Sequence, residues 1–131
     1  MKSSDSYGGF DNWILKLSNT GVILEQWIYG GVKDDFFEEI RVHTRKKAFW
    51  IGGTSHSGVG GNKLSPNFGK GDFWVFVIDS SGLKSLDKTF GSPKNDVCKD
   101  LEVSLEGSAI VAGFSSASGG NKLSSSNGGE D

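Results

Sequence analysis

The stretch DFWVFVID, residues 72–79, decides how this chain folds. Its central run FWVFVI is apolar without interruption, so an extended strand here would be apolar on both faces. A strand with one face in water alternates apolar and polar residues, and this one does not. A second apolar segment, AFWIGG at 48–53, precedes it across a Gly- and Ser-rich loop (54–71), and a third strand ends at KTFG, residues 88–91. The sequence therefore predicts strands that are covered on two sides.

The same order of features occurs more than once along the chain. Asp11 and Trp13 recur at one common spacing as Asp72 and Trp74, and the segment GNKLS at 61–65 returns at 120–124 after a slightly shorter interval. A repeat of this length is typical of solenoids, propellers or arrays. We therefore divide one propeller segment, 1–131, into a first unit at about 1–61, a second at about 62–120 and the start of a third at 121–131. Further pairs at the spacing of the aspartates are Gly21 and Gly82, Gly30 and Gly91, Asp35 and Asp96, Val42 and Val103, Ala48 and Ala109, and Gly52 and Gly113.

Each unit offers four strand candidates and no clear helical stripe. In the second unit they lie at 48–53, 73–79, 83–90 and 100–105, while 36–44 is open to a helical turn although its alternation favours a strand. We predict an all-β fold, a β-propeller built from four-stranded antiparallel blades with about two blades per chain. A β-solenoid is the second choice, because its repeats are usually shorter.

The blade boundaries follow from the small residues of 48–53, which suit an innermost strand beside a central channel. On this interpretation one blade runs from 48 to 105, the N-terminal part supplies three strands of another blade, and 109–114 supplies its first strand. Two blades cannot close a ring of about four to eight. We therefore expect either a ring of several copies, three giving six blades and four giving eight, or a piece of a longer chain.

Four segments carry a resemblance to a known family: DFWVFVIDSSG (72–82), LDKTFG (86–91), Asp96 and IVAGFS (110–115). Together they resemble the tandem β-propeller repeat of bacterial secreted and surface proteins, the SBBP-type repeat. The loop at 120–131 is similar to that family's linker into the next strand. The resemblance implies an extracellular or cell-surface location. The first unit departs from it at the turn 45–47, where RKK replaces the EGS of 106–108.

Composition excludes several classes of protein. The net charge is −2 with 23% charged residues, which argues against a nucleic-acid surface. The one dense basic cluster, residues 45–47, falls at a predicted turn. No apolar run approaches the roughly 18 residues of a membrane helix, and the polar residues after Met1 predict no signal peptide in the chain as given. Cys98 is the single cysteine, so no internal disulfide is possible.

The sequence offers no catalytic pattern. His43 and His56 have no metal-ligating neighbour at a fixed spacing, and no nucleophile-elbow sequence occurs. The carboxylate pairs at 34–35 and 38–39 are adjacent in sequence, whereas acid–base catalysis needs two carboxylates across a cleft. The glycine loop at 58–64 lacks the Gly-Lys-Ser/Thr ending of a phosphate loop. We therefore expect no enzyme activity and no cofactor.

Repeated polar and aromatic residues give the candidate binding sites. The four candidate ligand-binding residues are Trp13, Trp74, Asn62 and Asn121, although strand tryptophans more often pack between blades. Asp11, Asp72 and Asp131 recur just before the tryptophan strand. Their carboxylates could cap loop N–H groups, which we favour, or could bind calcium together with Asn67 and Asn127.

These observations predict a non-catalytic binding or structural module that mediates protein interaction outside the cell. Its partners would be copies of itself that complete the ring, or the rest of a longer chain. The loops at 54–71 and 115–131 would form the recognition surface. The alternative is a lectin-like oligomeric propeller that binds carbohydrate between adjacent blades. A propeller hydrolase would need convergent carboxylates on the inner strands, where acidic residues are few.

Overall fold

A computed structural model describes residues 6–128, which form eight strands and no helix. The strands make three antiparallel sheets: a β1–β2 hairpin, a middle sheet in the order β3–β4–β5–β6, and a β7–β8 hairpin. The all-β, antiparallel prediction is thus confirmed. The bounds are β1 (Asn12–Leu17), β2 (Ile23–Tyr29), β3 (Asp35–His43), β4 (Ala48–Ser55), β5 (Asp72–Ile78), β6 (Lys84–Phe90), β7 (Asp96–Val103) and β8 (Ala109–Ser115).

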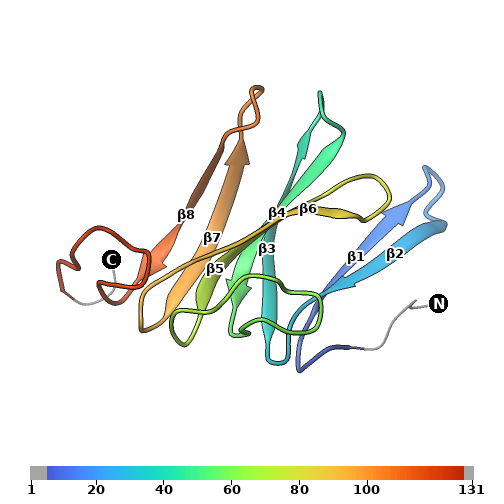
Figure 1. The fold of residues 1–131 in the computed structure, drawn as a ribbon. Helices are drawn as coiled ribbons and strands as arrows, with labels where there is room; N and C mark the ends of the chain where they lie inside the picture. The colour runs from blue at the N-terminus through green and yellow to red at the C-terminus, as the bar shows by residue number, and fades with distance from the viewer. Residues whose placement is uncertain (1–5, 129–131) are drawn as a thin grey trace.

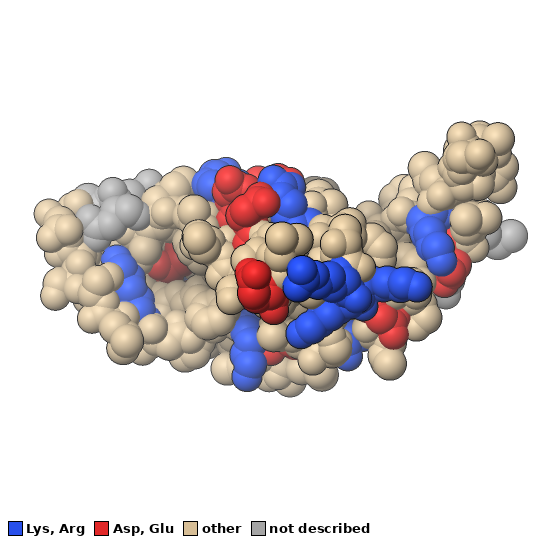
Figure 2. Space-filling view, turned by 90° about the horizontal axis from the view of Figure 1, so that it is seen from above, with Lys and Arg blue, Asp and Glu red and all other residues tan. Residues whose placement is uncertain are grey.

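The three sheets stand side by side in chain order, with the two termini at opposite flanks (Figure 1). Strand β7 packs against β3, β4 and β5 of the middle sheet. The outline is elongated, and the tip at the β1–β2 end carries no charged side chain on the face seen in Figure 2. Among residues 6–128, the middle sheet therefore has a neighbour on each face, whereas each hairpin has a neighbour on one face only.

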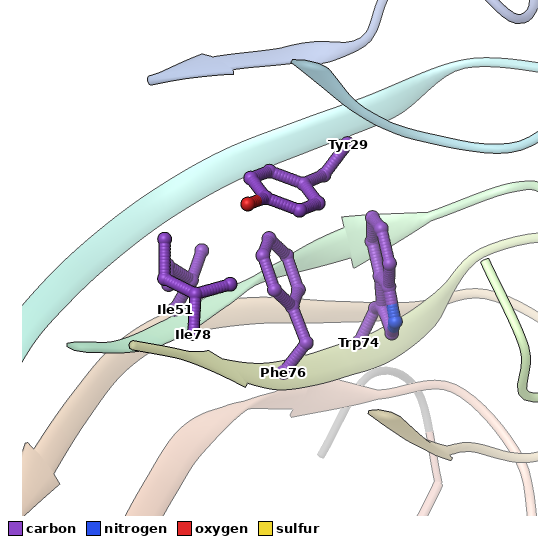
Figure 3. Close-up of a cluster of buried hydrophobic side chains, with 5 residues drawn as sticks. All are labelled: Tyr29, Ile51, Trp74, Phe76 and Ile78. Carbon is purple, nitrogen blue, oxygen red and sulfur yellow. The ribbon is translucent and has the colours of Figure 1, made fainter. Parts of the chain in front are cut away.

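The main core lies between the β1–β2 hairpin and the middle sheet. It consists of Tyr29, Ile51, Trp74, Phe76 and Ile78, with the Tyr29 ring lying over that of Phe76 (Figure 3). Ring centroids are 5.0 Å apart for Tyr29 and Phe76 and 4.5 Å apart for Trp74 and Phe76. Burying each of these side chains contributes about 1.5–3 kcal/mol. Three of the five come from the apolar run in β5.

The other face of β5 is covered by the β7–β8 hairpin. Val75 and Val77 alternate with the core residues and are buried too. Across the gap, a Cβ on Gly52 would lie 3.1 Å from the Leu101 side chain, which is fully buried on β7. The absence of a side chain at Gly52 thus lets the two sheets approach closely. The prediction that this strand is covered on both faces is confirmed.

The middle sheet is not the set of strands that the sequence suggested. It runs from Asp35 to Phe90, so its fourth strand is β3 and not 100–105, which falls largely in β7 and pairs with β8. Residues 48–53 lie inside the sheet, between β3 and β5, and not at an edge. The N-terminal part accordingly supplies two strands to its own sheet, not three. The physical reason is the tight turn at 44–47, which makes β3 and β4 a hairpin.

The backbone register also corrects the repeat spacing along β8. Asp35 and Asp96 occupy the same place in β3 and β7, but Gly53 pairs with Phe37 as Gly113 pairs with Cys98. Gly113 is therefore the counterpart of Gly53 and not of Gly52.

The difference arises at the turn between the two strands. Ser104 donates its backbone N–H to the Ser108 carbonyl at 2.8 Å, at the place where His43 pairs with Ala48. The turn 105–107 is therefore shorter by one position than the turn 44–47. This shortening moves the predicted Ala48–Ala109 and Gly52–Gly113 pairs by one position.

Candidate functional site

Strands β1 and β8 each have one edge that is not paired with another strand of the described chain. Within residues 6–128, β8 pairs with β7 alone and β1 pairs with β2 alone, whereas β4 and β5 pair with each other along the middle sheet. An open edge exposes a row of backbone N–H and C=O groups that favours pairing with another strand. These edges lie at opposite ends of the row of sheets (Figure 1).

An apolar hollow lies beside the β8 edge, between the middle sheet and β8. We call it the Val111 hollow. Its apolar walls are Trp50, Val75 and Phe90 from the middle sheet and Ala109 and Val111 from β8. Phe90 is 46% exposed there. The remaining lining residues are Leu86, Lys88, Gly107 and Ser108.

A second hollow continues from Phe90 toward the C-terminal loop. We call it the Asn121 hollow. Phe73, Phe90 and Gly91 line it from the middle sheet, and Asn121 and Lys122 line it from the loop. Ser115 and Asp96 complete its wall. One side of this hollow is therefore aromatic, and polar residues line the other side.

Asn62 and Asn121, both predicted as ligand-binding residues, make the same two backbone hydrogen bonds. The Asn62 side chain accepts from the Gly30 N–H at 3.0 Å and donates to the Ile28 carbonyl at 2.8 Å. The Asn121 side chain accepts from the Gly91 N–H at 2.8 Å and donates to the Thr89 carbonyl at 2.9 Å. Each amide therefore fastens a loop to the end of the preceding hairpin.

The two predicted tryptophans lie in opposite environments. Trp74 is buried in the core and donates from Nε1 to Asp87 Oδ1 at 2.9 Å. Trp13 is exposed, and its Nε1 donates to Gln26 Oε1 at 3.3 Å. Of the four predicted residues, Asn121 lies at a hollow, Trp13 lies on an open face, and Trp74 and Asn62 are in contacts within the chain. Ligand binding by these residues stays a prediction.

A buried polar network surrounds Trp74. The Lys63 ammonium donates to the Ser65 carbonyl at 2.7 Å and to Thr89 Oγ1 at 2.8 Å, and it lies 5.7 Å from the Trp74 ring. Burial lowers the pKa of Lys63, although the carboxylate of Asp87 opposes this. Sequence reasoning missed this residue, yet the return of lysine at the same place in both GNKLS segments was a signal for it.

Asp87 joins the network from strand β6. It forms an ion pair with Lys84 and accepts from Ser65 Oγ at 2.6 Å and from the Leu64 N–H at 3.0 Å. Burial alone would raise the pKa of Asp87, but these donors and Trp74 hold it below its usual value. The carboxylate is thus charged and well satisfied, and it ties the loop at 64–65 to the sheet.

The aspartates before the tryptophan strands act as caps. Asp72 Oδ2 accepts from the Phe68 N–H at 2.6 Å, and Asp11 Oδ2 accepts from the Tyr7 N–H at 2.7 Å. Burial raises the pKa of Asp72. No group of three His, Cys, Asp or Glu residues that could hold a metal forms within residues 6–128. Asp131, the third calcium candidate, lies outside the described residues, and calcium binding stays a prediction.

The remaining reactive side chains are held in structural contacts. His43 Nε2 lies 3.0 Å from the Leu105 carbonyl, and His43 Nδ1 accepts from the Lys46 N–H at 3.2 Å. The His56 ring meets Phe36 edge-on, with centroids 5.8 Å apart. Cys98 is fully buried beneath Gly52, and burial raises its thiol pKa to about 11. A thiol with so high a pKa is a poor nucleophile at neutral pH.

No family model matches the chain, and no curated protein matches its sequence. Within the described part of the chain there is no helix long and apolar enough to cross a membrane.

Proposed function

We propose that this chain is a non-catalytic β-propeller module that mediates protein interaction, in the first place with copies of itself. The observation that carries the proposal is the unequal cover of its sheets. Within residues 6–128 the middle sheet is packed on both faces, while the β1–β2 hairpin exposes Trp13, Leu15 and Leu17 and the β7–β8 hairpin exposes Ile110. Apolar faces of this kind mark interaction sites on soluble proteins.

The repeat supports a radial arrangement for these interactions. Four-stranded antiparallel sheets that stack face to face around an axis are the blades of a propeller. The two hairpins together hold as many strands as the middle sheet, so each chain brings strands for two blades. Three chains would then form six blades and four chains would form eight. The location outside the cell rests on the resemblance to the SBBP-type repeat alone.

Solution mass tests the proposal directly. The chain has a mass of 14.0 kDa, so light scattering should give about three or four times that value at micromolar concentration. Dilution should return a single chain, because the interfaces form between molecules. A mass of one chain at every concentration up to the solubility limit would overturn the proposal.

A lectin-like function is the second candidate, and the exposed indole of Trp13 favours it. An exposed tryptophan combines a large apolar surface with a polar tip, which suits contact with a ligand, and Gln26 lies beside Trp13. Quenching or enhancement of tryptophan fluorescence across a panel of glycans tests this, with the Trp13→Ala variant as control. A glycan response that is unchanged in Trp13→Ala would place any sugar site elsewhere.

A further inference from the structure

We propose that strand β1 of a second copy pairs with the open edge of β8, so that β7, β8 and the second copy's β1–β2 hairpin form one four-stranded sheet. This inference rests on the proposed function and specifies which strands, register and side chains make the contact between copies. The new sheet would be equivalent to β3–β4–β5–β6, which already exists within one chain.

The two outer hairpins have the same irregularities of backbone pairing as the two halves of the middle sheet, β3–β4 and β5–β6. The β1–β2 register shifts between Lys16 and Leu17, and the β5–β6 register shifts at the counterpart positions, between Val77 and Ile78. The β7–β8 hairpin likewise repeats the β3–β4 shift, which falls at 98–100 in β7 and at 37–39 in β3. The β7–β8 hairpin is therefore the counterpart of β3–β4, and the β1–β2 hairpin is the counterpart of β5–β6.

The pairing of β4 with β5 fixes the register expected between copies. Trp50 pairs with Val77, and Ile51 pairs with Phe76. In the repeat, Ile110 takes the place of Trp50, and Lys16 takes the place of Val77. Ile110 should therefore pair with Lys16 of the second copy, and Val111 should pair with Leu15 of the second copy in the same way. A slip by one residue would turn every side chain of β1 to the other face.

The Val111 hollow is lined by counterparts of main-core residues but has no side chains that fill it. Val75, Phe90 and Val111 are the repeat counterparts of Ile14, Tyr29 and Ile51, which pack at the main core. That core is filled by Trp74, Phe76 and Ile78 of β5. The counterparts of these three residues in the first repeat unit are Trp13, Leu15 and Leu17 of β1. The hollow therefore matches the side chains that β1 presents.

The side chains that would enter are the exposed ones. Trp74, Phe76 and Ile78 are 1%, 0% and 1% exposed. Their counterparts Trp13, Leu15 and Leu17 are 55%, 37% and 50% exposed. Large apolar side chains in a row on an open strand are an aggregation hazard unless a partner covers them. A second copy that offers the Val111 hollow gives them the environment of the main core.

The Asn121 hollow is placed to receive the Trp13 indole. In the main core, Lys63 lies over the Trp74 ring and Asn62 holds its loop against the preceding hairpin. Their counterparts Asn121 and Lys122 line the second hollow, next to Phe90. The Lys122 ammonium would then lie over Trp13 of the second copy, which is a favourable cation–π geometry.

One pair of segments would compete for the same place. Residues 6–11 lead into β1 as residues 67–72 lead into β5, because Asp11 and Asp72 both cap the strand that follows. By the GNKLS alignment, residues 126–128 are also counterparts of 67–69. When the copies pair, residues 126–128 of the first copy must therefore leave this position to residues 6–8 of the second. The contact is head to tail, which forms a ring when the rotation closes.

Disulfide trapping between two single-cysteine additions tests the register. Chains carrying Ile110→Cys and chains carrying Lys16→Cys are mixed and oxidised, and a covalent pair should form in high yield. The control mixes Ile110→Cys with Leu15→Cys, which the register places on the opposite face, and its yield should be at least tenfold lower. The natural Cys98 is common to all samples and is buried.

Three outcomes separate this inference from the proposed function. A high yield for the first pair alone supports both. Equal yields for the two pairs, or no covalent pair while light scattering still gives a mass of several chains, overturns the strand pairing and leaves the module interpretation standing. A single-chain mass with no covalent pair overturns both.

The Trp13→Ala variant tests the packing in the hollows. It should keep the far-ultraviolet circular dichroism spectrum of the original chain and should reduce association between copies at least tenfold. Unchanged association would contradict the packing in the hollows.

Discussion

The β5–β6 and β1–β2 hairpins have the same backbone pairing and opposite surroundings. Around Trp74, the hairpin carries Lys84, Asp87 and Thr89, which join the buried network of Lys63. At the matching positions β2 carries Ile23, Gln26 and Ile28. The comparison teaches that a strand with large apolar side chains is buried only where neighbouring sheets cover it. It also shows that the middle sheet combines a packed apolar face with a buried ion pair.

Replacing the two tryptophans should give the largest difference between the hairpins. Trp74→Ala empties a filled core and should destabilise the chain by about 3–5 kcal/mol. Trp13→Ala should cost less than about 1 kcal/mol in dilute solution, because the indole is already half exposed. Urea unfolding at a concentration low enough for light scattering to give the mass of a single chain measures both free energies. Equal losses would mean that the β1–β2 face is covered within a single chain.

The ion pair of the middle sheet should have the next largest effect. Asp87→Gln gives β6 the residue that β2 has and leaves Lys84 buried without its carboxylate, which should cost about 3 kcal/mol at neutral pH. The pKa of Asp87 is lower in the folded chain, so its stabilisation is complete above the unfolded value of about 4 and is lost as the pH falls through the folded pKa. The deficit of the variant should therefore shrink below about pH 4.

The control for this prediction is Glu25→Gln, which removes the exposed ion pair with Lys16. That change should cost less than about 1 kcal/mol, since exposed pairs are weak. Unfolding curves between pH 2 and 7 would measure both variants. A deficit of Asp87→Gln that stays constant down to pH 2 would contradict the role assigned to the carboxylate.

The smallest effect should come from shortening the chain after residue 125. Removing residues 126–131 frees the position for which 126–128 would compete, so association between copies should strengthen by up to about tenfold, which is ~1.4 kcal/mol. Sedimentation at matched concentrations compares the two chains, and the full-length chain carrying Trp13→Ala is the weakly associating control. Weaker association of the shortened chain would mean that these residues support the contact.

The sequence predicted the strands better than their grouping into sheets. The repeat and the apolar run at 73–78 identify the buried strand, because an extended segment that is apolar on both faces needs cover on both. A repeat has the same period whichever strand begins it, however, so the spacing of Asp11 and Asp72 could not say that a sheet starts at Asp35. The turn after β7 is one residue shorter than the turn after β3, and the sequence did not reveal this. Ala48 and Ala109 are identical by chance, so they were aligned although they are not structural counterparts.

The candidate site was predictable in its residues but not in its form. Asn62 and Asn121 stood out as repeated polar residues, and the structure gives both of them backbone partners that no spacing could identify. The hollows are made by residues far apart in the chain, such as Val75 and Val111. Which of them lies open depends on which neighbour is missing, and that is a property of the assembled sheets.

The buried Cys98 gives the molecule an internal reporter. Its sulfur lies in the seam between the middle sheet and the β7–β8 hairpin, and with a thiol pKa of about 11 it is almost fully protonated at neutral pH. A thiol-reactive dye can therefore label it only when the seam opens. The labelling rate would measure how often the β7–β8 hairpin separates from the middle sheet. Any stable assembly of these sheets requires that this separation be rare.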